Sequence, residues 1–227
     1  MQKYYGIELL RFFSSLSIVI YHWGTSFGLM KMEKNYPYES FLKLIYDYGV
    51  HAVPVFFVIS GLVFANVYLT HEKKETLHNF TIKRFARLYP LHLLTLVLIL
   101  FFQIIFYNFF GNYELYTFND FYHFLLKITF ILGWGFENGR SFNEPVWTVG
   151  LEIAIYYIFF SLITIIKKNR MSIIFLVYFF LLFVDKAKLT EFSIIKDFIN
   201  FFYFIEFAKL FFSGILIFFI IHQFKDS

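Results

Sequence analysis

The first apolar stretch of the chain carries a cation and an imidazole whose spacing places them on one side of a helix. Arg11 and His22 are eleven positions apart, and at about 100° per residue this separation comes within about 20° of three whole turns. The two side chains therefore share one stripe, roughly 16 Å apart along an axis that rises about 1.5 Å per residue. Glu8 precedes Arg11 by three residues, so these two can form an ion pair.

Both residue types can do chemistry at membrane depth. An imidazole with an ordinary pKa of about 6.5 can take the proton from an attacking hydroxyl group near neutral pH. A guanidinium can stabilise negative charge on a donor or on a tetrahedral intermediate, or position the transferred group. A charge in the membrane costs on the order of 3 kcal/mol, so Arg11 is expected to face inward. The alternative is that Arg11 snorkels to the headgroups and His22 ends the helix at the opposite interface.

A carboxylate lies inside another apolar stretch, at residues 143–157. Glu152 has Thr148 four residues before it and Tyr156 four residues after it, on the same helix face. At this depth a carboxyl group must be protonated, paired or placed in a wet cavity. Arg11 is a candidate partner, and a pair between Glu152 and Arg11 would be either purely structural or catalytic.

Three basic residues cluster just before Pro90. Lys83, Arg84 and Arg87 follow one another at helical spacings, so a helix here presents them on one broad face. Such a cluster beside an apolar segment usually sets topology and contacts anionic lipid. It is also the composition of a phosphate clamp, because arginine forms paired hydrogen bonds with phosphate oxygens.

Composition identifies the elements that must position these residues as membrane helices. Hydrophobic residues make up 59% of the 227 positions and the mean hydropathy is +0.63, well above the roughly 45 to 50% apolar usage of soluble domains. The chain has no cysteine, which excludes disulfides, thiol nucleophiles and cysteine-ligated metals. We expect no metal site and no nucleic-acid partner.

The apolar segments predict an all-α, polytopic transmembrane bundle in one domain, residues 1–227. A span needs roughly 20 apolar residues. The fourth and sixth segments are short, so each is expected to be a short, tilted or re-entrant helix. Seven segments are visible, at about residues 7–28, 46–69, 88–110, 121–136, 145–166, 172–184 and 198–222.

Basic residues outside the segments predict the orientation. If all seven segments cross, ten lysines and arginines fall on the side of the N-terminus and seven on the other side. This bias, together with the dense cluster at residues 73–87, favours a cytoplasmic N-terminus. In the second segment, the small pair Ser60 and Gly61 lets another helix or a ligand approach the backbone, and helix packing is the favoured role.

Four stretches, taken together and in order, resemble acyltransferase family 3, the integral-membrane O-acyltransferases that include bacterial polysaccharide O-acetylases. Phe211 to Gly214 is similar to a later F-x-x-G segment of the family. The four matching elements are Arg11 followed by ten residues and His22, the VFFVISG block at 55–61, the F-x-x-K-R-F-x-R-L-x-P block at 80–90, and Trp147 and Thr148 with Glu152 before Tyr156.

The resemblance implies transfer of an acyl group, usually acetyl from acetyl-CoA, to a hydroxyl of a cell-surface glycan or its lipid-linked precursor. It implies that Arg11 and His22 are essential and that Glu152 belongs to the site. It also places the acyl-CoA donor, a substrate and not a bound cofactor, on the basic block Lys83, Arg84 and Arg87. The implied partners are membrane lipid, the glycan acceptor and acyl-CoA, in a bacterial cytoplasmic membrane.

The separation along the helix assigns His22 to the reacting centre and leaves Arg11 open between donor binding and pairing with Glu152. With the N-terminus inside, His22 lies toward the outer face while CoA is cytoplasmic. Direct transfer and an acyl-histidine intermediate both remain open.

The chain ends after the seventh segment, so the resemblance covers the N-terminal two-thirds of the family pattern. A C-terminally truncated form is therefore expected, either a fragment, a frameshifted product or a reduced member. A transporter or flippase with a charged path is the alternative function, although no inverted repeat is visible. An inactive fragment is a third.

Overall fold

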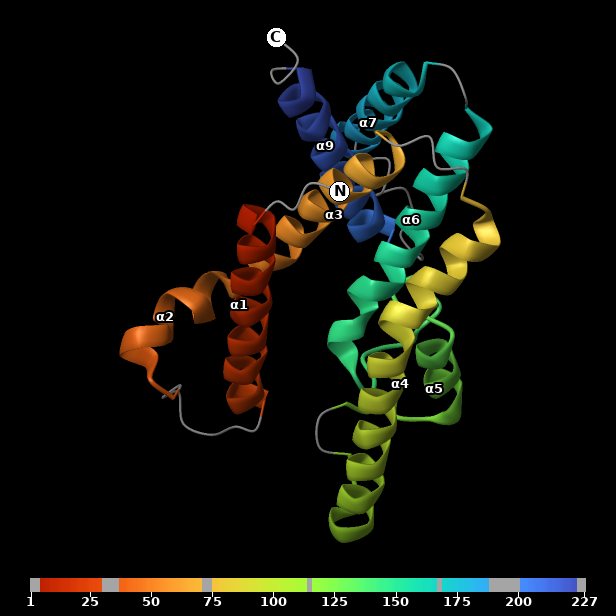
Figure 1. The fold of residues 1–227 in the computed structure, drawn as a ribbon. Helices are drawn as coiled ribbons and strands as arrows, with labels where there is room; N and C mark the ends of the chain where they lie inside the picture. The colour runs from red at the N-terminus through yellow and green to blue at the C-terminus, as the bar shows by residue number, and fades with distance from the viewer. Residues whose placement is uncertain are drawn as a thin grey trace. The chain divides into compact units, whose positions relative to one another are not determined.

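The computed structural model describes residues 5–29, 37–70, 75–113, 116–166, 169–187 and 201–223, and its regular elements there are helices (Figure 1). The expected all-α class is confirmed. Short 3-10 turns, Gly49–His51 and Glu144–Val146, lead into two of the helices. The helices are α1 (Tyr5–Leu29), α2 (Glu39–Tyr48), α3 (Ala52–Tyr68), α4 (Leu77–Phe110), α5 (Phe121–Ile128), α6 (Trp147–Ile165), α7 (Arg170–Lys186) and α9 (Phe201–Gln223).

Four stretches of the described chain are long and apolar enough to cross a membrane, so the protein is a multi-pass membrane protein. The seven expected apolar segments are not all confirmed as spans, because the first, the fourth and the sixth (7–28, 121–136 and 172–184) are not among these stretches. The fourth segment is helical only over the eight residues of α5, which rise about 12 Å and fall short of a hydrocarbon core about 30 Å thick. The four stretches are Glu39–Tyr68, Leu77–Phe110, Glu144–Ile165 and Tyr203–His222.

The helices form two compact units, which we describe separately. The first comprises residues 1–71 and 207–227, and the second comprises residues 72–206. Met1 and residues 73 and 74, which belong to the basic stretch 73–87 used to predict orientation, lie outside the described residues.

In the first unit, α1 packs against α2, the 3-10 turn that follows α2, and α3. Glycine permits a close contact with α1: a Cβ atom on Gly49 would lie 2.8 Å from the Cβ of Tyr21 and 2.9 Å from the Ser17 carbonyl oxygen. The packing therefore fixes one face of α1 toward the turn.

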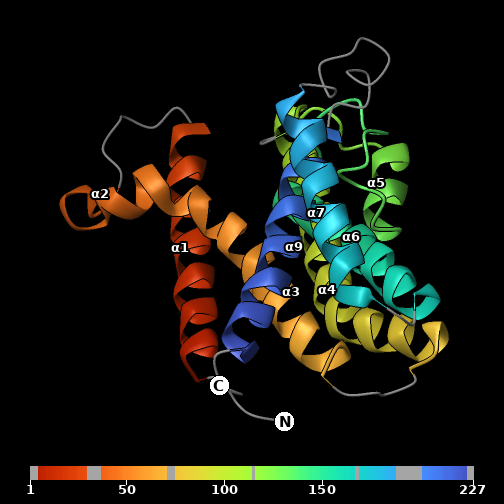
Figure 2. The same ribbon diagram turned by 90° about the horizontal axis from the view of Figure 1, so that it is seen from above.

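Helices α3 and α9 cross at two glycines (Figures 1 and 2). A Cβ on Gly61 would lie 1.8 Å from the carbonyl oxygen of Phe211, and a Cβ on Gly214 would lie 2.0 Å from that of Val58. Phe57 stacks on Phe207 beside this crossing, with ring centroids 4.3 Å apart. The predicted packing role of Gly61 is confirmed, and its partner is the F-x-x-G segment noted in the sequence.

Adding a methyl group at the crossing is expected to destabilise the first unit. Gly61→Ala and Gly214→Ala should each lower the free energy of unfolding by about 1 to 3 kcal/mol, because the new Cβ meets backbone that cannot rotate away. Gly6→Ala is the control. Gly6 also lies in a helix but has no atom within 4 Å of a Cβ, so alanine should be neutral or stabilise by up to about 1 kcal/mol. Thermal unfolding in detergent measures all three. Equal melting of Gly61→Ala and Gly6→Ala would contradict the close crossing.

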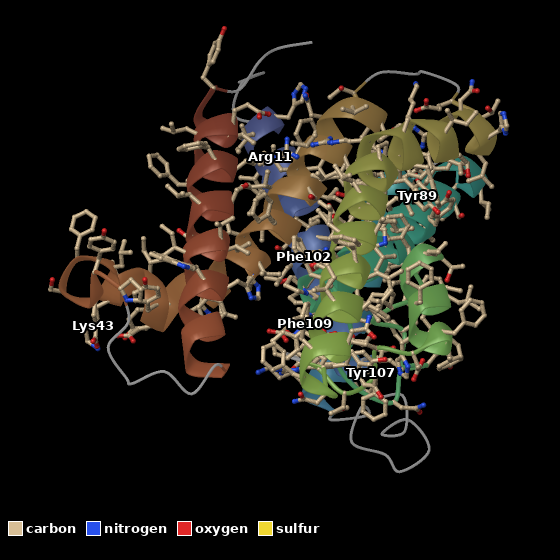
Figure 3. The ribbon with its side chains drawn as sticks, turned by 90° about the horizontal axis from the view of Figure 1, so that it is seen from below. Arg11, Lys43, Tyr89, Phe102, Tyr107 and Phe109 are labelled. Atoms are coloured by element: carbon tan, nitrogen blue, oxygen red, sulfur yellow. The ribbon has the colours of Figure 1, made fainter. Side chains whose placement is uncertain are left out.

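In the second unit, α4 and α6 pack side by side in opposite directions. Phe80 near the start of α4 stacks on Phe160 near the end of α6, with centroids 4.3 Å apart, and the Tyr157 hydroxyl donates to Thr81 Oγ1 at 2.7 Å. The second half of α4 keeps large apolar side chains exposed, including Phe102 and Phe109 (Figure 3). Such a surface suits a lipid-facing helix.

The segment between α4 and α6 contains one short α-helix, α5, and an irregular stretch that packs beside both long helices. Asp120 caps the start of helix α5, because its side chain accepts from the His123 backbone N–H, and the helix lies next to α4 (Figure 1). Residues 129–146 then return without a further α-helix. Phe130 anchors this return, because its ring packs against Phe85 and His92 of α4.

Candidate active site

Helix α1 carries Arg11 and His22 on one unbroken helix, as their spacing predicts. Arg11 lies about two turns from its start (Figure 3) and forms the expected ion pair with Glu8, Nη1 to Oε1 3.4 Å. The Arg11 side chain is 25% exposed and that of Glu8 is 70% exposed. Ser15 on the same stripe donates its hydroxyl to the Arg11 carbonyl oxygen at 2.8 Å.

The side of α1 that carries these residues is its less exposed side. Arg11, Ile18 and His22 are half-buried, whereas Phe12 and Val19 are exposed. The His22 ring meets the ring of its neighbour Tyr21 edge to face, with centroids 5.4 Å apart. The inward and the snorkelling orientation of Arg11 both remain predictions, and the His22 imidazole is half-buried on the same helix.

Glu152 is held from its own helix, as expected from residues four positions apart. The Tyr156 hydroxyl donates a hydrogen bond to Glu152 Oε1. Thr148, the other expected neighbour, donates instead to the Pro145 carbonyl oxygen at 3.2 Å. Arg11 belongs to the first unit and Glu152 to the second, so their pairing stays a prediction.

The three cations of the basic block lie on helix α4 at the expected spacings, but in two different environments. Arg84 is half-buried against α6, with its guanidinium 5.4 Å from the centroid of the Phe80 ring and 5.6 Å from that of Tyr156. Lys83 and Arg87 are exposed, and Lys83 is paired with Glu75. Tyr156 thus brings a cation of the basic block close to Glu152, a proximity that the sequence did not suggest.

A buried ionic cluster in the second unit was not among the predicted site residues. Lys127 at the end of α5 has a fully buried side chain. Its Nζ lies 3.4 Å from Glu144 Oε2 and donates to the Asn143 carbonyl oxygen at 3.2 Å. The Ser141 backbone N–H donates to the same Glu144 oxygen at 3.2 Å. A lysine within an apolar segment was the available signal, but the sequence could not show which acid meets it.

This cluster connects three elements. The Lys127 backbone carbonyl oxygen lies 2.8 Å from His92 Nε2 on α4, and Asn143 Nδ2 donates to Thr95 Oγ1, also on α4, at 3.1 Å. Glu144 begins the 3-10 turn that leads directly into Trp147 and α6. The cluster therefore fixes the point at which the helix carrying Glu152 starts.

Burial changes the protonation of this cluster. Desolvation lowers the pKa of Lys127 to about 8, although the charge of Glu144 acts in the opposite direction. Nearby, the pKa of Asp120 is lowered because its carboxylate accepts the His123 backbone N–H. The lysine is thus protonated at neutral pH and loses its charge in mildly alkaline solution.

The fold and these sites define a multi-pass helical membrane protein with charged and polar groups held between its helices. A family model described as an acyltransferase domain matches residues 4–226. The chain therefore belongs to acyltransferase family 3 and is a membrane acyltransferase by family. No curated protein and no solved structure matches it.

Proposed function

We propose that the protein moves an acyl group from acyl-CoA to a hydroxyl of a cell-surface glycan or of its lipid-linked precursor. The observation that carries this proposal is the placement of Arg11 and His22, both half-buried, along one stripe of one helix, in a chain that the family model matches almost from end to end. Acetyl is the group that the family usually transfers. A bacterial cytoplasmic membrane and a cytoplasmic N-terminus complete the proposal.

The reaction needs one base and one group that stabilises negative charge. Neutral His22 accepts the proton of the acceptor hydroxyl while its oxygen forms a bond to the thioester carbonyl carbon. The carbon–sulfur bond then breaks, and the thiolate takes up the proton to leave as free CoA. Arg11 either binds the donor or stabilises the negative charge of the intermediate. Glu152 orients neighbouring side chains on α6, such as Tyr156.

Transfer from labelled acyl-CoA tests the function directly. The purified full chain is reconstituted in vesicles with acyl-CoA and a glycan acceptor, and ester-linked label on the acceptor is measured after alkaline release. Transfer above that of protein-free vesicles supports the proposal. Its absence across donors and acceptors, with the protein correctly inserted, would favour a transporter or an inactive fragment.

The basic block is expected to divide into a donor-binding part and a structural part. Arg87→Gln should weaken binding of CoA by about tenfold, a loss of about 1.4 kcal/mol, with normal thermal stability, because Arg87 is exposed and available for phosphate. Arg84→Gln should lower thermal stability, since it removes a cation packed between Phe80 and Tyr156.

Isothermal titration with CoA and thermal unfolding separate the two effects. Lys43→Gln is a matched control, because Lys43 is an exposed cation paired with Asp47 outside the block. Unchanged CoA affinity in Arg87→Gln would leave the block with only its topological role.

A further inference from the structure

A partly open cavity of about 520 Å³ lies in the second unit, between α4, α6, the returning segment after α5 and Phe204 of α9. Its volume falls in the range of pockets that hold drug-sized ligands, far above what an acetyl group fills. Aromatic and aliphatic side chains dominate its wall. Its wall includes Phe85 of α4, Phe130, Ile131 and Trp134 of the returning segment, and Ala154 and Ile158 of α6.

The few polar groups in the wall already have partners. The Thr129 hydroxyl donates to the Leu125 carbonyl oxygen at 2.9 Å, and the Tyr157 hydroxyl donates to Thr81. The Trp134 indole N–H donates to the Gly150 carbonyl oxygen at 3.2 Å. A polar ligand would have to give up its hydrogen bonds to water without replacement, which costs several kcal/mol. The cavity therefore suits a hydrocarbon.

The backbone that forms one wall is held in an unfavourable conformation. Phe130 has a φ of 56°, in the left-handed region that a bulky residue rarely adopts. The Leu132 carbonyl oxygen lies so close to α6 that a Cβ on Gly150 would be 2.2 Å from it. Such strain persists where surrounding structure enforces it and is concentrated at ligand sites. The buried contacts of Lys127 supply that enforcement just before the strained residue.

We propose that this cavity receives the acyl chain of the donor and that the protein accepts acyl groups longer than acetyl. The inference rests on the proposed acyl transfer. Of the two substrates of that reaction, the glycan is polar, whereas the acyl chain is apolar up to its reacting carbonyl. Irregular backbone beside membrane helices is tolerated where it lines such a cavity, so the returning segment forms its wall.

Tryptophan quenching tests the proposal, because Trp134 lines the cavity. The probe is octanoyl-CoA brominated along its chain, added to the full chain in detergent. Quenching should saturate, unlabelled octanoyl-CoA should displace the probe, and acetyl-CoA should displace it poorly. Ala154→Phe, which fills the cavity, should weaken probe binding by at least about tenfold. Ala154→Leu is a smaller change that serves if the larger side chain lowers the yield of folded protein.

Ala86→Phe is the matched control, because Ala86 is exposed on α4 and is not part of the cavity wall, and it should bind the probe normally. Equal displacement by acetyl-CoA, or normal binding by both Ala154 variants, would overturn the proposal. The proposal would also be overturned if brominated phospholipid quenched the tryptophan fluorescence to the same extent and octanoyl-CoA did not displace it, since the cavity would then hold bilayer lipid. Binding that depends on the length of the acyl chain, without any transfer, would reject the proposed function alone. Acetyl transfer, without binding that depends on acyl-chain length, would reject only this inference.

Discussion

Replacing His22 with alanine is expected to lower acyl transfer by about 10²- to 10⁴-fold, the usual contribution of a positioned general base. The protein should still insert at normal levels, because His22 is only half-buried on α1 and its removal leaves little unfilled space. The measurement is ester-linked acyl on the acceptor, normalised to protein in the membrane.

His51→Ala is the matched control for this experiment. His51 is an exposed histidine of the same unit, in the turn before α3, and its loss should leave transfer unchanged. Arg11→Lys should also lose most activity if paired guanidinium hydrogen bonds matter, since lysine keeps the charge but not the planar fork. Wild-type ester content in His22→Ala would return this histidine to the role of a helix-end residue at the interface.

Glu144→Gln is expected to destabilise the second unit by about 3 kcal/mol at about pH 6.5. The reason is the fully buried Lys127, which is protonated in the wild type at this pH and would lose its ion pair with the Glu144 carboxylate. Asp47→Asn is the control, because its ion pair with Lys43 is exposed on both sides and should contribute no more than about 1 kcal/mol. Thermal unfolding in detergent measures both variants.

The pH dependence makes this prediction specific. The pKa of Lys127 is lowered to about 8, so the lysine is charged below that pH and largely neutral at about pH 9.5, where it no longer needs the carboxylate. The difference in stability between wild type and Glu144→Gln should therefore shrink as the pH rises from about 6.5 to 9.5.

Effects of pH that act equally on the wild type and on Glu144→Gln cancel in the difference between their stabilities. In the wild type, the unfolded chain binds more protons than the folded chain between the lowered pKa and the ordinary value of 10.5, so the contribution of Lys127 to stability increases with pH. Only the interaction with Glu144 distinguishes the two proteins. A loss of stability that is equal at both pH values would show that Glu144 acts as a neutral hydrogen-bond acceptor.

The sequence alone determined the features that depend on local periodicity and on residue type. Hydropathy and composition predicted a helical membrane protein, and the eleven-residue spacing placed Arg11 and His22 on one stripe of one helix. Contacts within a few turns of the same helix also followed, such as Glu8 with Arg11 and Tyr156 with Glu152. Helical geometry fixes these contacts wherever the helix lies.

The tertiary structure decided which segments cross and which side chains meet across long separations. Hydropathy could not decide whether the fourth apolar segment forms one crossing helix or α5 followed by a returning segment, because its residues are apolar in both cases. The basic block divided because α6 packs on one side of α4 and draws Arg84 toward Tyr156. Lys127 and Glu144 are 17 residues apart, and no periodicity relates positions joined by an irregular segment. Their pairing, and the cavity beside it, arise only when α4, α5 and the start of α6 close around the same point.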